Sequence, residues 1–160
     1  MDIILLDMRL RNTNGLELMK KHLTDGNSKV IAVTGMDGIE LIINLLKSGV
    51  NGIVYKLDGY KEIVSAIKTV LISGSYYPER ILKVIQSNFQ HWDHVPPIVL
   101  STPEMELLRA IAKGETTKEI AEELKMSTAT AETYRVRLMK KVGVSNTAAL
   151  LAYAYRNGIL

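Results

Sequence analysis

Short apolar runs alternate with helical patterns along the first half of the chain. The runs lie at residues 1–7, 29–34 and 52–56, and each is almost continuously apolar, which is typical of parallel strands buried on both faces. Apolar residues recur at helical spacing after each run. Three successive strand–helix units predict a parallel sheet with right-handed crossovers. The expected helices cover residues 15–24, 38–48 and 60–72, with Asn14 and Asp37 as caps of the first two.

The second half of the chain carries only helical patterns. A helix is expected at residues 79–89, and Pro96 and Pro97 then interrupt the pattern because proline lacks the N–H donor that a helix needs. Ser101 and Glu104 form a capping box that opens the next helix. The inward side of that helix is expected to consist of Met105, Leu108, Ile111 and Ala112. The chain therefore divides into an α/β unit (residues 1–74), a linker with a helix (75–97) and an all-α unit (98–160).

Residues 116–143 predict two helices joined by a tight turn. Thr116 and Glu119 have the spacing of a capping box at the start of the first helix. Hydroxyl side chains in residues 127–130 offer N-caps for the second helix after a break of about three residues. Two helices with so short a break are typical of a helix-turn-helix unit, which places its second helix in the major groove of DNA.

The second helix has one apolar stripe and one polar face. Opposite the stripe, the 100° advance per residue places Thr133, Val136 and Lys140, with Glu132 and Arg137 beside them. Threonine and valine can contact a thymine methyl group, glutamate can accept from a cytosine amine, and cations meet phosphates. A solvated amphipathic helix would be the better interpretation if the charge run stood alone. The candidate DNA contacts are Lys118, Thr128, Glu132, Thr133, Arg135, Val136, Arg137, Lys140 and Lys141.

Composition narrows the class of protein further. With 160 residues, 47% of them hydrophobic, the chain can build two small cores. It contains no cysteine, so disulfides and zinc fingers are excluded, and a net charge of +3 does not by itself indicate nucleic acid. No run reaches the roughly 18 apolar residues of a membrane span. These features predict a soluble, cytoplasmic protein.

Each predicted strand ends on a polar side chain, namely Asp7, Thr34 and Lys56. In open parallel sheets, functional groups collect beyond the carboxyl ends of the strands. This arrangement, with the segment DMRLRNTNG after the first strand, resembles the flavodoxin-like receiver domain of two-component response regulators. The resemblance implies that Asp7 accepts a phosphoryl group from a sensor histidine kinase, that the Thr34 hydroxyl bonds to it, and that Lys56 pairs with its charge.

The resemblance is incomplete at the front of the chain. A receiver has two further strands and the acidic residues that hold Mg²⁺ before its phosphoacceptor strand, and no carboxylate pair precedes Asp7 here. Arg11 and Ile53 also differ from the family pattern. We therefore expect no cofactor, with Mg²⁺ only where a longer chain supplies its ligands, and phosphorylation control that is lost or incomplete. The chain is interpreted as a fragment or as a truncated regulator with a three-strand receiver remnant.

The missing strand would have a structural consequence. The family's strand order places it beside residues 1–6, so this apolar strand would become a sheet edge. Apolar edges are templates for pairing with another chain. We therefore expect the sheet to pair edge to edge in a homodimer or a swapped assembly.

Residues 98–160 resemble the effector domain of the NarL/FixJ (LuxR-type) class without a gap. The spacing from Leu100 and Glu104 through the Lys118–Ala121 and Glu132–Arg135 segments to the Lys141–Gly143 segment carries the resemblance. It implies a four-helix unit whose third helix enters the major groove and whose last helix, residues 147–156, forms the dimer contact. The apolar side of this helix suits either dimerisation or the domain's own core. It consists of Ala149, Leu150, Ala152 and Tyr153.

Three functions remain open at this point. The leading one is a transcription regulator, not an enzyme, that binds double-stranded DNA as a dimer. The second is a protein that forms mixed dimers with a full-length regulator and changes its activity. The third treats Asp7 as an active, self-catalysed phosphoryl acceptor. A metal site at His91 and His94 is disfavoured, because only Asp93 lies near them, and Trp92 is expected to pack the linker on a domain.

Overall fold

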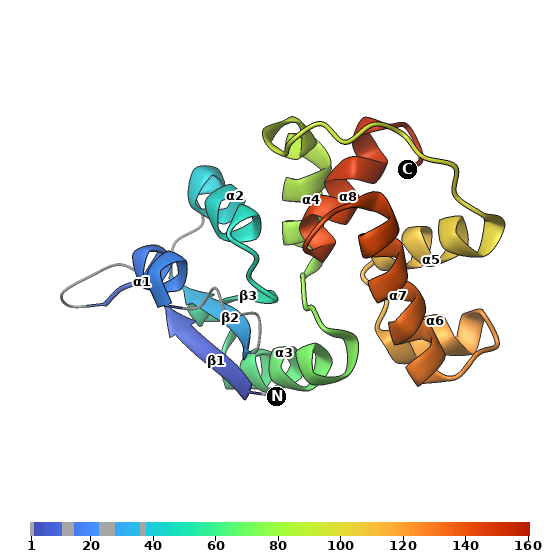
Figure 1. The fold of residues 1–160 in the computed structure, drawn as a ribbon. Helices are drawn as coiled ribbons and strands as arrows, with labels where there is room; N and C mark the ends of the chain where they lie inside the picture. Colours follow the sequence, from blue (N-terminus) through green and yellow to red (C-terminus); the bar gives the residue numbers. More distant parts are fainter. Residues whose placement is uncertain (1, 11–14, 23–27, 36–37) are drawn as a thin grey trace.

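A computed structural model describes residues 2–10, 15–22, 28–35 and 38–160, and Figure 1 shows its fold. Asn14, Asp37 and Arg11, which the sequence analysis singled out, lie outside the described residues. The strands are β1 (Asp2–Asp7), β2 (Ser28–Thr34) and β3 (Gly52–Tyr55). The helices are α1 (Gly15–His22), α2 (Ile39–Lys47), α3 (Tyr60–Ser73), α4 (Glu79–Asn88), α5 (Thr102–Ala112), α6 (Thr117–Glu123), α7 (Thr128–Val142) and α8 (Thr147–Arg156), with short 3-10 turns η1 (Lys56–Asp58) and η2 (Phe89–His91).

The strands form a parallel sheet in the order β1-β2-β3, which confirms the predicted fold class. Leu6, Ala32 and Ile53 lie on the sheet face that α1 and α2 cover, and they belong to the larger hydrophobic core. Ile31 and Val54 lie on the opposite face, where Ala66 and Val70 of α3 pack against them. The apolar runs are thus strands buried on both faces, as their composition indicates.

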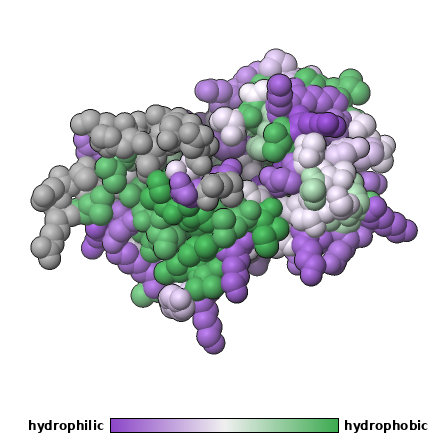
Figure 2. Space-filling model, turned by 60° about the horizontal axis from the view of Figure 1, so that its bottom comes forward, coloured by the Kyte–Doolittle hydropathy of each residue, from purple (hydrophilic) through white to green (hydrophobic). Residues whose placement is uncertain are grey.

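The strand β1 is the exception, because within the described residues it pairs only with β2. Its Leu5 points to the α3 side of the sheet, beyond the part that α3 covers, and 46% of the residue is exposed. Figure 2 shows hydrophobic residues gathered over the side of the molecule where β1 and α3 lie. Among the described residues, β1 therefore stands at one end of the strand order.

The all-α unit is built around buried leucines of three helices, Leu108, Leu138 and Leu150. The predicted inward side of α5 is partly wrong. Leu107 and Ala110 are buried with Leu108 and Ile111, whereas Met105 and Ala112 are only half-buried. The reason is that α6, α7 and α8 all contact α5, and together they cover an arc that a single apolar stripe does not describe. The residue before α2 is Gly38, which supplies no side-chain cap.

The segment expected as a linker is an integral part of the core. Ile81 and Ile85 of α4 are fully buried, and α4 contacts both α2 and α8. Trp92 is buried as predicted, and the Arg156 guanidinium donates to its carbonyl oxygen at 2.7 Å. The Tyr153 hydroxyl accepts from the Ile98 amide at 2.9 Å, which ties the following residues to α8. The domain boundaries stay a prediction, since α4 joins the two units in one hydrophobic core.

The sequence left open whether the apolar side of α8 forms a dimer contact or part of the domain's own core. Leu150, Ala152 and Tyr153 are buried within the chain, and Ala149 is half-buried. Their neighbours include α4, η2, α2 and α5. The apolar side of α8 therefore belongs to the chain's own core.

Tyr77 provides a test of how the segment before α4 is held to the α/β unit. Its buried hydroxyl donates to the Val50 carbonyl oxygen at 2.7 Å, and burial raises the pKa of the phenol. Replacing Tyr77 with phenylalanine leaves that carbonyl unpaired, so we expect the free energy of unfolding to fall by about 1–3 kcal/mol in urea denaturation. Tyr60→Phe is the control, because Tyr60 is 79% exposed and should change stability little. Equal stabilities of the two variants would contradict this role of Tyr77.

Candidate functional site

The carboxyl ends of β1 and β3 bring two of the predicted site residues together. The Lys56 ammonium lies 2.7 Å from the Asp7 carboxylate, measured from Nζ to Oδ2. The other carboxylate oxygen accepts from the Arg9 amide at 2.9 Å. Thr34 ends β2, the strand between them, and is fully buried. The parallel sheet thus places the three strand ends at one edge, as the sequence indicated.

The electrostatics of this edge favour an ionised aspartate. The hydrogen bond from Lys56 and that from the Arg9 amide hold the pKa of Asp7 below its ordinary value. Both charged side chains are about two-fifths exposed, at 44% for Lys56 and 41% for Asp7, so reactants in solution can reach them. The Lys56 ammonium can attract an anionic phosphoryl group to the accessible carboxylate oxygen beside it.

A divalent cation is poorly matched to this edge in the part of the chain that the structure describes. There, no three or more histidine, cysteine, aspartate or glutamate side chains group together as metal ligands. Both oxygens of Asp7 already accept from Lys56 and Arg9. Mg²⁺ prefers several hard oxygen ligands in octahedral geometry. The described residues therefore do not fit a Mg²⁺ site, and we derive no step through a metal.

A second candidate site consists of α6, α7 and the turn between them. The Thr116 side chain accepts from the Glu119 amide, and Glu119 accepts from the Thr116 amide at 2.7 Å, which confirms the capping box. Ser127 caps α7 by accepting from the Thr130 amide at 3.0 Å. Lys125 takes the left-handed conformation with φ 52°, which lets the chain reverse within four residues. The helix-turn-helix prediction is confirmed at the level of geometry.

Most of the predicted DNA-contacting side chains are exposed. The Thr133 hydroxyl donates to the Ala129 carbonyl oxygen one turn earlier at 2.9 Å. Val136 is 51% exposed although it is apolar. An exposed valine between polar neighbours is the residue type that can contact a thymine methyl group. The exposed candidates are Lys118, Thr128, Thr133, Val136, Arg137, Lys140 and Lys141.

Lys141 is exposed but already has a partner. Its ammonium lies 2.6 Å from Oε2 and 2.9 Å from Oε1 of Glu104. Hydrogen bonds from Lys141 and from the Ser101 amide lower the pKa of this carboxyl group. A DNA phosphate would have to compete with Glu104 for Lys141. The interaction ties α7 to the capping box of α5.

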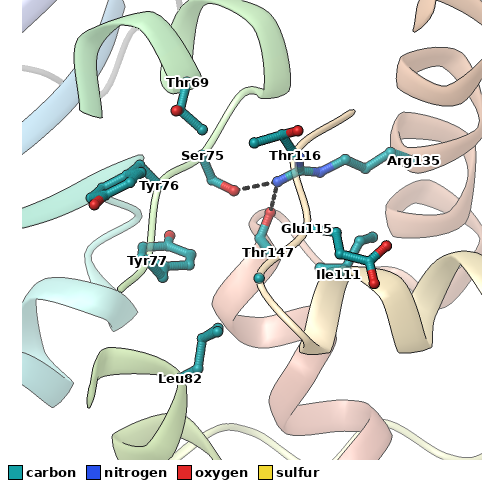
Figure 3. Close-up of a pocket in the computed structure, with 11 residues that line it drawn as sticks. Thr69, Ser75, Tyr76, Tyr77, Leu82, Ile111, Glu115, Thr116, Arg135 and Thr147 are labelled. Atoms are coloured by element: carbon teal, nitrogen blue, oxygen red, sulfur yellow. Dashed lines mark hydrogen bonds between the residues drawn. The ribbon is translucent and has the colours of Figure 1, made fainter. Parts of the chain in front are cut away.

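Arg135 contradicts the sequence prediction in this arrangement. Only 4% of its surface is exposed, so it cannot meet a phosphate. Its guanidinium donates to the Ser73 carbonyl oxygen, to the Ser75 hydroxyl, and to the Thr147 hydroxyl at 2.6 Å, and Figure 3 shows it reaching from α7 toward these last two side chains. Burial lowers the pKa of the guanidinium, although arginine keeps its charge in proteins. The physical reason for the error is position, because Arg135 lies on the stripe of Ala131, Leu138 and Val142.

The surroundings of Arg135 form a polar junction that the sequence analysis missed. Of the five polar or charged side chains that are buried among the described residues, four belong to it: Ser73, Thr117, Arg135 and Thr147. The Ser73 hydroxyl accepts from the Thr117 amide at 2.9 Å. The available signal was the placement of hydroxyl residues at the ends of two predicted helices. This signal becomes informative only once the end of α3 is known to meet α6, α7 and α8.

Two hollows border this junction, and Arg135 lines both of them. One, of about 80 Å³, is lined by residues that include Ser75, Tyr77 and Thr147, as Figure 3 shows. The other, of about 110 Å³, is lined by Glu132 and Val136 of α7 and by Asn51, which precedes β3. Glu132 is half-buried, and its carboxylate lies 3.5 Å from the Thr117 hydroxyl. The α/β unit therefore lies along one side of α7, next to two of the candidate DNA contacts.

None of the helices in the described part of the chain combines the length and apolar character that crossing a lipid bilayer requires.

Comparison with known proteins assigns both halves of the chain. Residues 1–68 match the response regulator receiver domain, and residues 98–154 match the luxR family of bacterial regulatory proteins. The transcriptional regulatory protein MctR of Rhizobium johnstonii is 32% identical over 161 residues, which cover 99% of this chain and 73% of MctR. The virulence transcription regulator BvgA of Bordetella pertussis is 28% identical over 160 residues, which cover 99% of this chain and 77% of BvgA.

A solved structure of the RcsB response regulator of Salmonella typhimurium is similar with a TM-score of 0.48 and 22% identity, over 94% of this chain and 74% of that one. The relatives are matched from one end of the chain to the other, with the receiver match before the luxR match. The chain therefore belongs to the response regulators that join a receiver domain to a DNA-binding domain of the luxR family.

Proposed function

We propose that this chain is a sequence-specific, DNA-binding transcription regulator of a two-component system, working in the cytoplasm. The observation that carries the proposal is the geometry of α7, a capped helix whose exposed side presents Thr133, Arg137 and Lys140. Hydroxyl and methyl groups on such a helix reach base edges, while the cations bind phosphates. Lys118 and Thr128 lie at the start of their own helices, where a duplex in contact with α7 would also pass.

We propose further that the regulator binds DNA as a homodimer. A helix-turn-helix unit reads only a short half-site, and two copies related by a twofold axis read two half-sites one helical turn apart. The affinity for DNA then depends on how the two copies associate. MctR and BvgA are both named as transcription regulators, which supports this functional class.

In this arrangement the α/β unit and DNA compete for one side of α7. Glu132 and Arg135 turn toward the α/β unit, and Val136 lines the hollow between the two units. A duplex that seats α7 in its major groove, about 12 Å wide, needs room along most of the helix. DNA binding through Glu132 and Val136 therefore requires the two units to separate. The polar junction at Arg135 opposes this separation.

Asp7 is the proposed phosphoacceptor, with a sensor histidine kinase as the donor, and Thr34 and Lys56 as its partners. The support is the ion pair between Lys56 and Asp7 together with the position of Thr34 on the intervening strand. A phosphoryl group on Asp7 would add negative charge beside the Lys56 ammonium, a favourable charge-assisted contact. The extent of phosphorylation control, which we expect to be lost or incomplete, stays a prediction.

Salt dependence tests the DNA interface. We expect the affinity for a mixed-sequence duplex to fall as salt rises, because each phosphate that a cation neutralises releases counterions. Lys140→Gln should flatten the plot of log K against log salt by about one unit, measured by fluorescence anisotropy. Lys68→Gln is the control, since Lys68 is an exposed residue of α3. The interface is misplaced if both variants keep the slope of the unmodified chain.

Weakening the polar junction at Arg135 tests whether the α/β unit and DNA compete for α7. The double variant Ser73→Ala with Ser75→Ala removes the hydrogen bond to the Thr117 amide and one hydrogen bond of Arg135. Each bond contributes about 1 kcal/mol, so their loss favours the open form by about 2 kcal/mol and the Kd for the duplex should fall by roughly thirtyfold. Ser65→Ala with Ser87→Ala, both exposed, is the matched control. An unchanged Kd in the junction variant would show that the contact does not oppose DNA binding.

The titration of Asp7 tests the strand-end site. Lys56→Gln removes the main cause of its lowered pKa, so the pKa of Asp7 should rise toward its ordinary value in an NMR titration of the carboxyl carbon. Because the folded-state pKa lies below the unfolded one, the pair stabilises the fold above the unfolded pKa. That contribution is lost as pH falls through the folded pKa, and it is small at this exposure. Lys61→Gln, in α3, should leave the titration unchanged. A shift of equal size in both variants would contradict the specific ion pair.

A further inference from the structure

The 3-10 turn η1 carries two ion pairs that face different parts of the molecule. Its first residue, Lys56, lies 2.7 Å from the Asp7 carboxylate, measured from Nζ to Oδ2. Its last residue, Asp58, accepts from the Arg80 guanidinium of α4. The Gly59 amide donates to the Lys56 carbonyl oxygen at 3.4 Å, which closes the turn. Because only one residue stands between Lys56 and Asp58 in this closed turn, a shift of one of them also displaces the other.

Arg80 binds the end of β3 through two contacts. Besides its bond to Asp58, its guanidinium carbon lies 3.6 Å from the centre of the Tyr55 ring. A cation over the face of an aromatic ring is attracted by the electrons of the ring. Tyr55 directly precedes η1, so both contacts come from the four consecutive residues 55–58. The start of α4 is therefore fastened to the same short segment that carries Lys56.

The segment between α3 and α4 leads from Arg80 back to the polar junction. Its Tyr76 amide donates to the Asn51 carbonyl oxygen at 2.7 Å, so the segment lies against the start of β3. Its Ser75 hydroxyl accepts from the Arg135 guanidinium, a bond that Figure 3 shows. Arg80 thus fixes one end of a short stretch of chain whose other end supplies an acceptor to the junction.

The helix α4 is tied to α8 at its other end. Arg156 of α8 donates to the carbonyl oxygens of Phe89 and Trp92, which follow α4, at 3.2 and 2.7 Å. When the two units separate, α4 therefore stays with α8, and the contacts of Arg80 with Tyr55 and Asp58 break. These contacts belong to the closed form alone. A perturbation shifts an equilibrium only through such a difference between the two forms.

We propose that Arg80 is a positioning residue that couples the strand-end site to the polar junction, so that a change at Asp7 alters the hold of the α/β unit on α7. The inference deepens the regulation of the proposed function and rests on it. A phosphoryl group extends beyond the Asp7 carboxylate, and the Lys56 ammonium shifts to follow its charge. The turn η1 then leaves the place in which Asp58 meets Arg80. The segment that carries Ser75 loosens, and the two units separate more readily.

Amide hydrogen exchange of the full chain, followed by NMR, tests the hold of Arg80 on the junction. The Thr117 amide donates to the Ser73 hydroxyl at 2.9 Å and loses this acceptor when the units separate. Arg80→Gln removes a partly exposed ion pair and a cation–π contact, so exchange at Thr117 should accelerate by roughly fivefold. Lys83→Gln is the matched control and should change nothing, because Lys83 pairs with Glu79 inside α4. An unchanged rate in Arg80→Gln overturns the proposal.

A double-mutant cycle tests whether the effect of Lys56 passes through Arg80. Lys56→Gln removes the bond that holds η1 to Asp7, so it should accelerate exchange at Thr117 in the unmodified chain. In a chain that already carries Arg80→Gln, it should add nothing. Asp58→Asn gives the same cycle from the other side of the ion pair, which covers a failure of Arg80→Gln to fold. No effect in the unmodified chain, or equal effects in both backgrounds, overturns the coupling.

Neither measurement uses DNA, so the coupling and the proposed function can fail separately. A chain that shows the coupling but binds no duplex contradicts the proposed function alone. A chain that binds DNA with the expected salt dependence but shows additive variants contradicts the role of Arg80 alone.

Discussion

The buried guanidinium of Arg135 is the interaction on which the relation between the two halves depends. A charge removed from water is costly unless hydrogen bonds replace its hydration, and here the acceptors are all neutral: a carbonyl and two hydroxyl oxygens. Two of these acceptors, on Ser73 and Ser75, come from the end of α3 and the residues just after it, and the third, on Thr147, begins α8. No one element could satisfy the guanidinium alone. Its burial therefore requires α7, α8 and the segment after α3 to meet.

The apolar core reinforces this requirement from the other side of the junction. Ile81 and Ile85 of α4 are fully buried between α2 and α8, so the chain between the two units is packed rather than extended. The Arg80 guanidinium lies 3.6 Å above the ring of Tyr55 and pairs with Asp58, which fixes the start of α4 to the end of β3. The hydrophobic contacts determine that the units associate. The directional bonds of Arg135 and Arg80 determine the orientation in which the units associate.

The sequence predicted what depends on neighbours along the chain and failed where distant segments meet. Capping boxes such as that of Thr116 and Glu119 are local, and the strand-end placement of Asp7 and Lys56 follows from three repeated units whose connections have one hand. Arg135 lies on the helical stripe of the buried residues Ala131, Leu138 and Val142. Arg135 is buried rather than directed at a phosphate because it bonds to Ser73 and Ser75, some sixty residues away in the sequence. No local pattern carries that information.

The junction and the strand-end site are joined by one rigid element. The 3-10 turn that begins at Lys56 leads into α3, which starts at Tyr60 and ends at Ser73, so about 20 Å of helix separates the two sites. A packed helix moves as a body because its interior contacts are too dense to absorb a local shift. The ion pair of Lys56 with Asp7 lies near the start of this helix, and the hydrogen bonds of Arg135 lie at its end. A change in either one therefore acts on an end of the same helix. Coupling between them through α3 requires this helix to have two discrete packings against Ile31 and Val54, since spatial continuity alone does not supply a switch.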